Sequence, residues 1–98
     1  MALPAVYRRK VGRDLAGAYG WYEQQRTGLG EEFLAAVNAS FDAIQEYPEM
    51  FARVDGEIRR AIVARFPYAV FYRIEAKRLV VLAVLHMARD PKLWPKRA

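Results

Sequence analysis

The stretch that decides the fold is Ile58–Asp90, which reads IRRAIVARFPYAVFYRIEAKRLVVLAVLHMARD. It holds three apolar runs rich in Val, Ile, Phe and Tyr, a composition typical of strands rather than helices. Pro67 lies at the first join between these runs, and Ala76 and Lys77 lie at the second. The stretch therefore predicts three consecutive strands joined by short turns.

A register for the last two strands follows if Ala76 and Lys77 form a two-residue hairpin loop, which places Glu75 opposite Arg78. Side chains alternate between the two faces of a sheet, so the paired residues sort into two sets. The uncharged set is the expected core face: Tyr68, Val70, Tyr72, Ile74, Leu79, Val81, Ala83 and Leu85. The mixed set is expected on the second face and includes Phe71, Arg73, Leu82, Val84 and His86. A slip of one residue would exchange the two faces.

Two amphipathic helices are predicted before these strands, over Val11–Arg26 and Glu31–Tyr47, because apolar residues recur there with a helical period. Gly28 is well placed to follow the first helix. Ala2–Arg9 fits a short edge strand. The order is then strand, helix, helix and three strands. It predicts an α+β fold, with a helical hairpin on one face of a largely antiparallel four-stranded sheet.

The second face of this predicted sheet needs a cover of its own, because two helices shield one face only. Leu93 and Trp94 in the tail can cover part of it. Soluble proteins rarely leave a large apolar patch exposed, so we expect a partner chain to cover the rest. The second face is therefore predicted to be an interaction surface.

Composition narrows the classes of function. The 98 residues are expected to form a single domain, residues 1–98. The chain has no Cys and only one His, which excludes disulfides and two-His metal sites, and no Gly-rich phosphate loop follows a strand. We therefore predict no metal and no cofactor. Without an N-terminal apolar signal region or an apolar run of membrane-spanning length, a soluble cytoplasmic protein with no membrane partner is expected.

Basic residues supply the candidate chemistry, and the net charge of +5 suits a nucleic-acid or acidic-protein partner as well as an ordinary soluble protein. His86 together with Arg73 and Arg89 could cleave RNA without a metal, with the imidazole as acid or base and the guanidinium groups on the phosphate. The alternative is a structural His at the end of a strand. Arg59, Arg60 and Arg65 are expected to share one strand, either as a basic stripe or as solvated side chains.

The segment from Arg59 to Arg73, with FPYAVFYR inside it, and the later LAVLHMARDP together resemble the RelE/ParE superfamily of type II toxins. The resemblance extends over nearly the whole chain, including the two helices and the Pro48-Glu49 loop. It implies a small toxin made beside an antitoxin that wraps and neutralises it. It also implies that the pair contacts operator DNA only through the antitoxin.

Two branches of that superfamily differ in mechanism. RelE-like members cleave mRNA on the ribosome, and ParE-like members poison DNA gyrase without being nucleases. Ala69 stands where several of the ribonucleases have Arg, and Met87 and Ala88 follow His86 where a Tyr is expected. The chain is therefore more similar to ParE-like members, with RelE-like mRNA cleavage as the alternative. The residues expected to contact the antitoxin or target are Arg60, Arg65, Phe71, Arg73, Leu82, Val84, His86 and Arg89.

Overall fold

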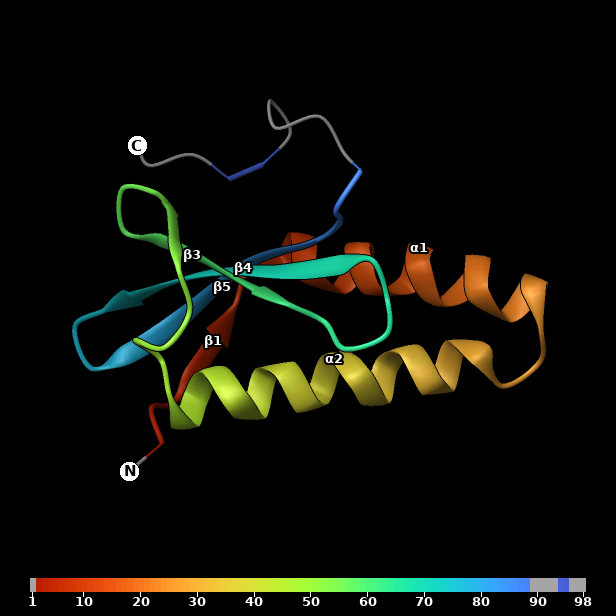
Figure 1. Cartoon of the computed structure of the whole chain (residues 1–98), viewed down its shortest axis with the longest axis horizontal. Coiled ribbons are helices and arrows are strands. Elements are labelled where there is room, and N and C mark those ends of the chain that lie inside the picture. The colour runs from red at the N-terminus through yellow and green to blue at the C-terminus, as the bar shows by residue number, and fades with distance from the viewer. Residues whose placement is uncertain (1, 89–93, 96–98) are drawn as a thin grey trace.

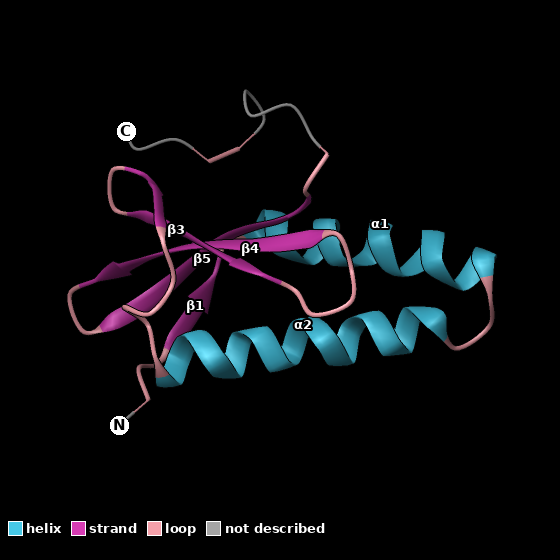
Figure 2. Cartoon of the chain, in the orientation of Figure 1, coloured by secondary structure: helices cyan, strands magenta, loops and turns pink. Residues whose placement is uncertain are grey.

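The computed structural model describes residues 2–88 and 94–95 of the chain. A short strand is followed by a helical hairpin and four further strands (Figures 1 and 2). The elements in chain order are β1 (Ala5–Tyr7), α1 (Arg9–Gln25), α2 (Leu29–Glu46), β2 (Arg53–Asp55), β3 (Ile58–Ile62), β4 (Tyr68–Glu75) and β5 (Arg78–His86). The α+β fold predicted from the sequence is confirmed, and both helices begin about one half-turn earlier than predicted.

The sheet has five strands in the order β1-β5-β4-β3-β2, one more than predicted. The missed strand is β2, which has only three residues and no alternating apolar pattern. It pairs with β3 through the turn at Gly56, whose φ of 57° lies in the left-handed region. β1 joins the opposite edge, parallel to β5, and the helical hairpin leads the chain from β1 at this edge to β2 at the other.

The turn between the two helices is held by Glu23. Its carboxylate accepts hydrogen bonds from the backbone amides of Gly28, at 3.0 Å, and Gly30, at 2.9 Å, which satisfies donors at the start of α2. Gly28 has a φ of 92°, and a Cβ on Gly30 would lie 2.8 Å from the side chains of Glu23 and Tyr19. Gly28 therefore allows the left-handed backbone of the turn, and Gly30 allows α2 to approach α1 closely.

The helices bury one face of the sheet, which we call the helix face. Its core includes an aromatic cluster of Tyr22, Phe33, Phe66 and Tyr68, in which Phe33 is fully buried. Neighbouring rings in this cluster lie 4.9–5.3 Å apart between centroids. Such contacts add to the free energy gained from apolar burial, so this layer forms the principal core.

The predicted β4–β5 register is right near the hairpin and wrong beyond it. Glu75 pairs with Arg78 and Tyr72 pairs with Val81, as predicted, but Phe71 then pairs with Ala83 instead of Leu82. This β-bulge leaves Leu82 as an extra residue and shifts the rest of β5 by one position. Beyond the bulge, every side chain of β5 lies on the face opposite to the one predicted.

Because of the bulge, four residues of β5 were predicted on the wrong face of the sheet. Val84 and His86 lie toward the helices, not on the second face, whereas Ala83 and Leu85 lie on the second face, not in the helix core. The second face is also not open. Phe71 is 1% exposed and Leu82 is 9% exposed, and together with Ile58, Ala69, Val80, Ala83 and Leu85 they form a second buried cluster.

Trp94 covers this second cluster, as its position in the tail suggested. Its ring lies 5.4 Å from the ring of Phe71, between centroids, and the guanidinium carbon of Arg60 lies 5.4 Å from the indole centroid. The indole nitrogen of Trp94 is buried and has no hydrogen-bond partner among the described residues. Leu93, the other residue expected to cover this face, lies outside the described residues.

Candidate functional surfaces

The second face presents a mixed surface around Trp94. Ile62 lies on this face because it pairs with Ala69, and it is 60% exposed. Arg73 lies at the other end of the face and binds Glu75, with its Nε 2.9 Å from a carboxylate oxygen. Apolar and basic side chains therefore flank a buried centre, an arrangement suited to a partner that is both apolar and acidic.

The ion pairs on Glu75 set the electrostatics at that end. Hydrogen bonds from Arg78 and then Arg73 lower the pKa of the Glu75 carboxyl below its usual value.

On the helix face, burial raises the pKa of Tyr72 to about 12. The Tyr72 hydroxyl donates a hydrogen bond to the Pro48 carbonyl at 2.7 Å, so it ties the loop after α2 to the sheet.

The predicted basic stripe of Arg59, Arg60 and Arg65 does not form. Arg59 and Arg60 are adjacent on β3 and lie on opposite faces, and Arg59 donates to the Glu49 and Phe51 carbonyls at 3.1 and 2.7 Å. Arg65 follows the end of β3 and has a φ of 69°, so it belongs to the turn before β4. Only Arg60 of the three lies beside Phe71 on the second face.

His86 and Arg73 do not share a site. They lie near opposite ends of the hairpin and on opposite faces, since Arg73 pairs with Val80, about six residues or 20 Å along β5 from His86. The His86 Nδ1 accepts a hydrogen bond from the Ala88 amide at 3.0 Å. Arg89 lies outside the described residues. The two described members of the predicted RNA-cleaving trio, His86 and Arg73, are therefore not brought together.

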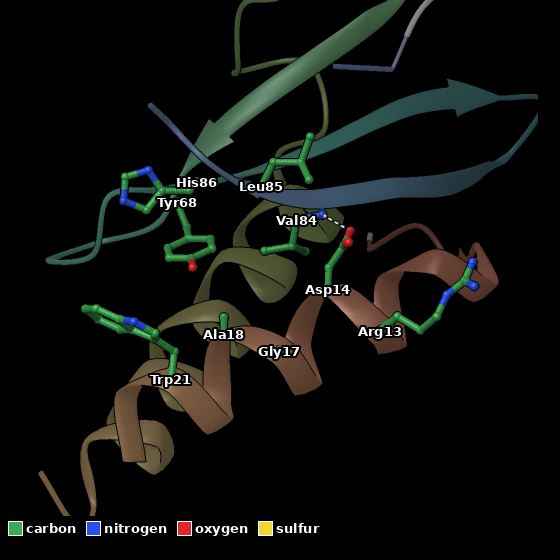
Figure 3. A pocket seen from close by; sticks show the side chains of 9 residues that line it. All are labelled: Arg13, Asp14, Gly17, Ala18, Trp21, Tyr68, Val84, Leu85 and His86. Carbon is green, nitrogen blue, oxygen red and sulfur yellow. Dashed lines mark hydrogen bonds between the residues drawn. The ribbon is translucent and has the colours of Figure 1, made fainter. Parts of the chain in front are cut away.

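His86 instead lines a cavity of about 360 Å³ between α1 and the end of β5 (Figure 3). Trp21, Tyr68 and His86 gather at one end, and Arg13 lies at the other. The rings of Tyr68 and His86 are 5.2 Å apart in an edge-to-face arrangement. Trp21 and Arg13 were not predicted as site residues from the sequence, although their spacing along the first helix could have indicated them.

Asp14 closes this cavity against the sheet. β1 ends at Tyr7, so the later part of β5 has α1 beside it instead of a strand. There the Val84 amide donates a hydrogen bond to Asp14 Oδ2 at 3.0 Å. The other oxygen, Oδ1, binds the Lys10 ammonium at 2.7 Å. Asp14 therefore supplies the acceptor that a neighbouring strand would otherwise give just after the bulge.

Across residues 2–88 and 94–95, no group of three or more His, Asp or Glu side chains is arranged to hold a metal ion. Of the helices in this part of the chain, neither has the length and apolar character needed to cross a membrane.

The fold defines a class of proteins. A structure described as "Chromosomal ParDE TA system from P. aeruginosa" superposes with a TM-score of 0.77 and 16% sequence identity, over 87% of this chain and 96% of that one. The helical hairpin on a mixed five-stranded sheet is thus a ParE-like fold. The family model described as "ParE toxin of type II toxin-antitoxin system, parDE" matches residues 5–91, so the chain belongs to the ParE toxin family of the RelE/ParE superfamily. No curated protein matches the sequence.

Proposed function

We propose that this chain stops growth by binding and poisoning DNA gyrase in the cytoplasm, and that a cognate antitoxin neutralises it. The observation that carries the proposal is the ParE family match over residues 5–91. The same fold can serve different targets, so the fold alone does not identify one. Gyrase is proposed as the target by analogy with ParE-like toxins. The ParDE description of the similar structure supports an antitoxin partner.

A binding mechanism also agrees with the geometry. Metal-free RNA cleavage needs an acid or base and a cation within reach of the same phosphate. His86 and Arg73 lie on opposite faces and about 20 Å apart along the hairpin, so they cannot contact one phosphate. This separation favours a toxin that acts by binding over the RelE-like ribonuclease alternative.

We place the antitoxin on the second face, with Arg60, Ile62 and Arg73 as its first contacts. Ile62 is exposed there, and Arg60 and Arg73 add positive charge. Phe71 and Leu82, both predicted contacts, become accessible only if Trp94 leaves the face. Val84, His86 and Arg65 lie elsewhere, so we do not include them in this interface.

A supercoiling assay with purified chain and DNA gyrase tests the target. The expected result is inhibition with trapped cleaved DNA, reversed when the neighbouring antitoxin is added. His86→Ala should leave this inhibition intact. Absence of any effect on gyrase, with mRNA cleavage on ribosomes that His86→Ala abolishes, would instead establish the ribonuclease alternative.

A titration of the antitoxin tests the interface separately. Ile62→Asp and Arg73→Glu should each weaken antitoxin binding by ten-fold or more, about 1.4 kcal/mol, because both side chains are proposed as direct contacts. Lys77→Glu, an exposed change in the β4–β5 loop, is the matched control and should leave the affinity unchanged. Unchanged affinity for the folded Ile62 and Arg73 variants would move the interface to another surface.

A further inference from the structure

A ridge along α1 carries a surface feature that the proposed function does not use. Arg9, Arg13, Gly17 and Trp21 recur at intervals of four residues, and residues four apart are neighbours on a helix surface. All four are exposed, and Trp21 is 57% exposed. The ridge therefore runs from two guanidinium groups at the start of the helix to an open indole near its end.

The cavity between α1 and β5 lies along this ridge (Figure 3). Gly17 lines its middle, and a Cβ at Gly17 would meet nothing within 4 Å, so nothing blocks an approaching ligand there. A second cavity of about 410 Å³ shares Trp21, Tyr68 and His86 with the first. Each cavity falls within the roughly 300–1,000 Å³ that is typical of ligand sites.

The charges around the ridge suit an anion. Asp14 is the only carboxylate among the described residues that line the first cavity, and it already binds Lys10 and the Val84 amide. Neither Arg9 nor Arg13 forms an ion pair with another described residue. The net charge of +5 adds a field that attracts polyanions.

We propose that the ridge from Arg9 to Trp21 binds single-stranded nucleic acid. In this arrangement Arg9 and Arg13 contact successive phosphates, and a base stacks on Trp21 at the aromatic end of the cavity. Basic side chains beside exposed aromatic faces are the usual means of binding single strands without reading their sequence. An acidic peptide would engage the arginines alone and leave the aromatic end unused. This site is separate from the second face and does not depend on gyrase being the target.

Fluorescence of Trp21 gives the first test. The sequence has two tryptophans, so Trp94→Phe leaves Trp21 as the single indole reporter. Short oligothymidylate and oligouridylate should quench it at low salt. In fluorescence anisotropy with labelled strands, Trp21→Ala should weaken binding about five-fold or more, and Trp21→Phe should retain most of the affinity, because every aromatic face can stack with a base. A preference for one strand identifies DNA or RNA as the ligand.

The salt dependence gives the second test. Each phosphate contact that is lost should reduce the slope of log K against log salt by about 0.7 for a single strand. Arg9→Ala and Arg13→Ala should each produce that reduction. Arg53→Ala removes the same charge from β2, at the opposite edge of the sheet, and should leave the slope unchanged.

Three results would overturn the proposal. One is no binding of either strand by the folded protein at low salt. Another is an equal effect of Arg53→Ala and Arg13→Ala, which would show attraction by net charge alone. The third is displacement by polyglutamate as effective as displacement by unlabelled oligothymidylate, which would assign the ridge to an acidic peptide.

Discussion

The two faces of the sheet are both apolar, but they are buried by different means. The helix face is covered by two helices, and Phe33 of α2 packs against Phe66 and Tyr68. The second face is a smaller cluster, and among the described residues its cover from outside the strands is Met87 and Trp94. The helix face therefore holds the fold together, whereas the cover of the second face is a local contact that a partner chain could replace.

The largest expected effect concerns the aromatic cluster of the helix face. Phe33→Ala should lower the free energy of unfolding by about 3–5 kcal/mol, because it leaves a cavity between rigid helices and strands. Urea unfolding measures this loss. Phe71→Ala is the matched change on the second face and should cost less, because the Trp94 segment can settle into the space. Equal losses would remove the distinction between the faces.

The next largest effect concerns Asp14, which binds the Val84 amide just after the bulge in β5. Asp14→Ala should lower the free energy of unfolding by about 1.5–3 kcal/mol, because it leaves the Val84 amide without its charged acceptor. The exposed Asp42 on α2 is the control, and Asp42→Ala should change stability by less than about 0.5 kcal/mol. Similar losses for both variants would show that Asp14 does not hold the bulge.

A smaller effect is expected from the cover of the second face. Trp94→Ala removes an aromatic contact and a cation–π contact, which together contribute about 1–2 kcal/mol. The variant should stay folded and bind a hydrophobic dye more strongly, while Trp21→Ala should not increase dye binding. Global unfolding by Trp94→Ala would show that the second face is as essential to the fold as the helix face.

The smallest effect at neutral pH concerns the Tyr72 hydroxyl on the helix face. Burial raises the pKa of Tyr72 from 10.0 to about 12, so folding favours the protonated phenol. The stability that this adds is fully present below pH 10 and is lost as pH rises toward 12. Tyr72→Phe should cost about 1 kcal/mol at neutral pH through the lost hydrogen bond to Pro48. It should also flatten the alkaline decline in urea-unfolding free energy between those two pH values. If the decline is the same in the Tyr72→Phe variant, other ionisable groups cause it.

Much of the fold could be predicted because it depends on local patterns. The helical period, the glycines of the first turn and the apolar runs from Ile58 onward identified two helices and three strands. β2 was missed because three residues carry too little pattern, and its pairing depends on β3. The β4–β5 register was right up to Tyr72 and wrong beyond it, because a bulge changes no residue type and leaves no signal in an apolar run.

The candidate site residues were likewise placed correctly up to the bulge in β5 and wrongly beyond it. Phe71, Arg73 and Leu82 were placed on the correct face, because their positions in the β4–β5 pair lie before the bulge or at it. The face of Arg60 was left open in the prediction, and the β3–β4 register puts it opposite Phe71. His86 and Val84 were placed on the wrong face, because they follow it. The cavity beside Trp21 was not predicted at all, because it joins α1 to residues more than forty positions away in the sequence.

The sequence by itself determined the element types, their order and the membership of a toxin superfamily, because periodicity, turn residues and local motifs are properties of neighbouring residues. Tertiary structure decided which side chains meet. Asp14 binds the Val84 amide across seventy positions of sequence, and that contact accompanies the one-residue shift that turns His86 toward Trp21. Such a shift depends on how α1 packs beside β5, since β1 is too short to complete that edge.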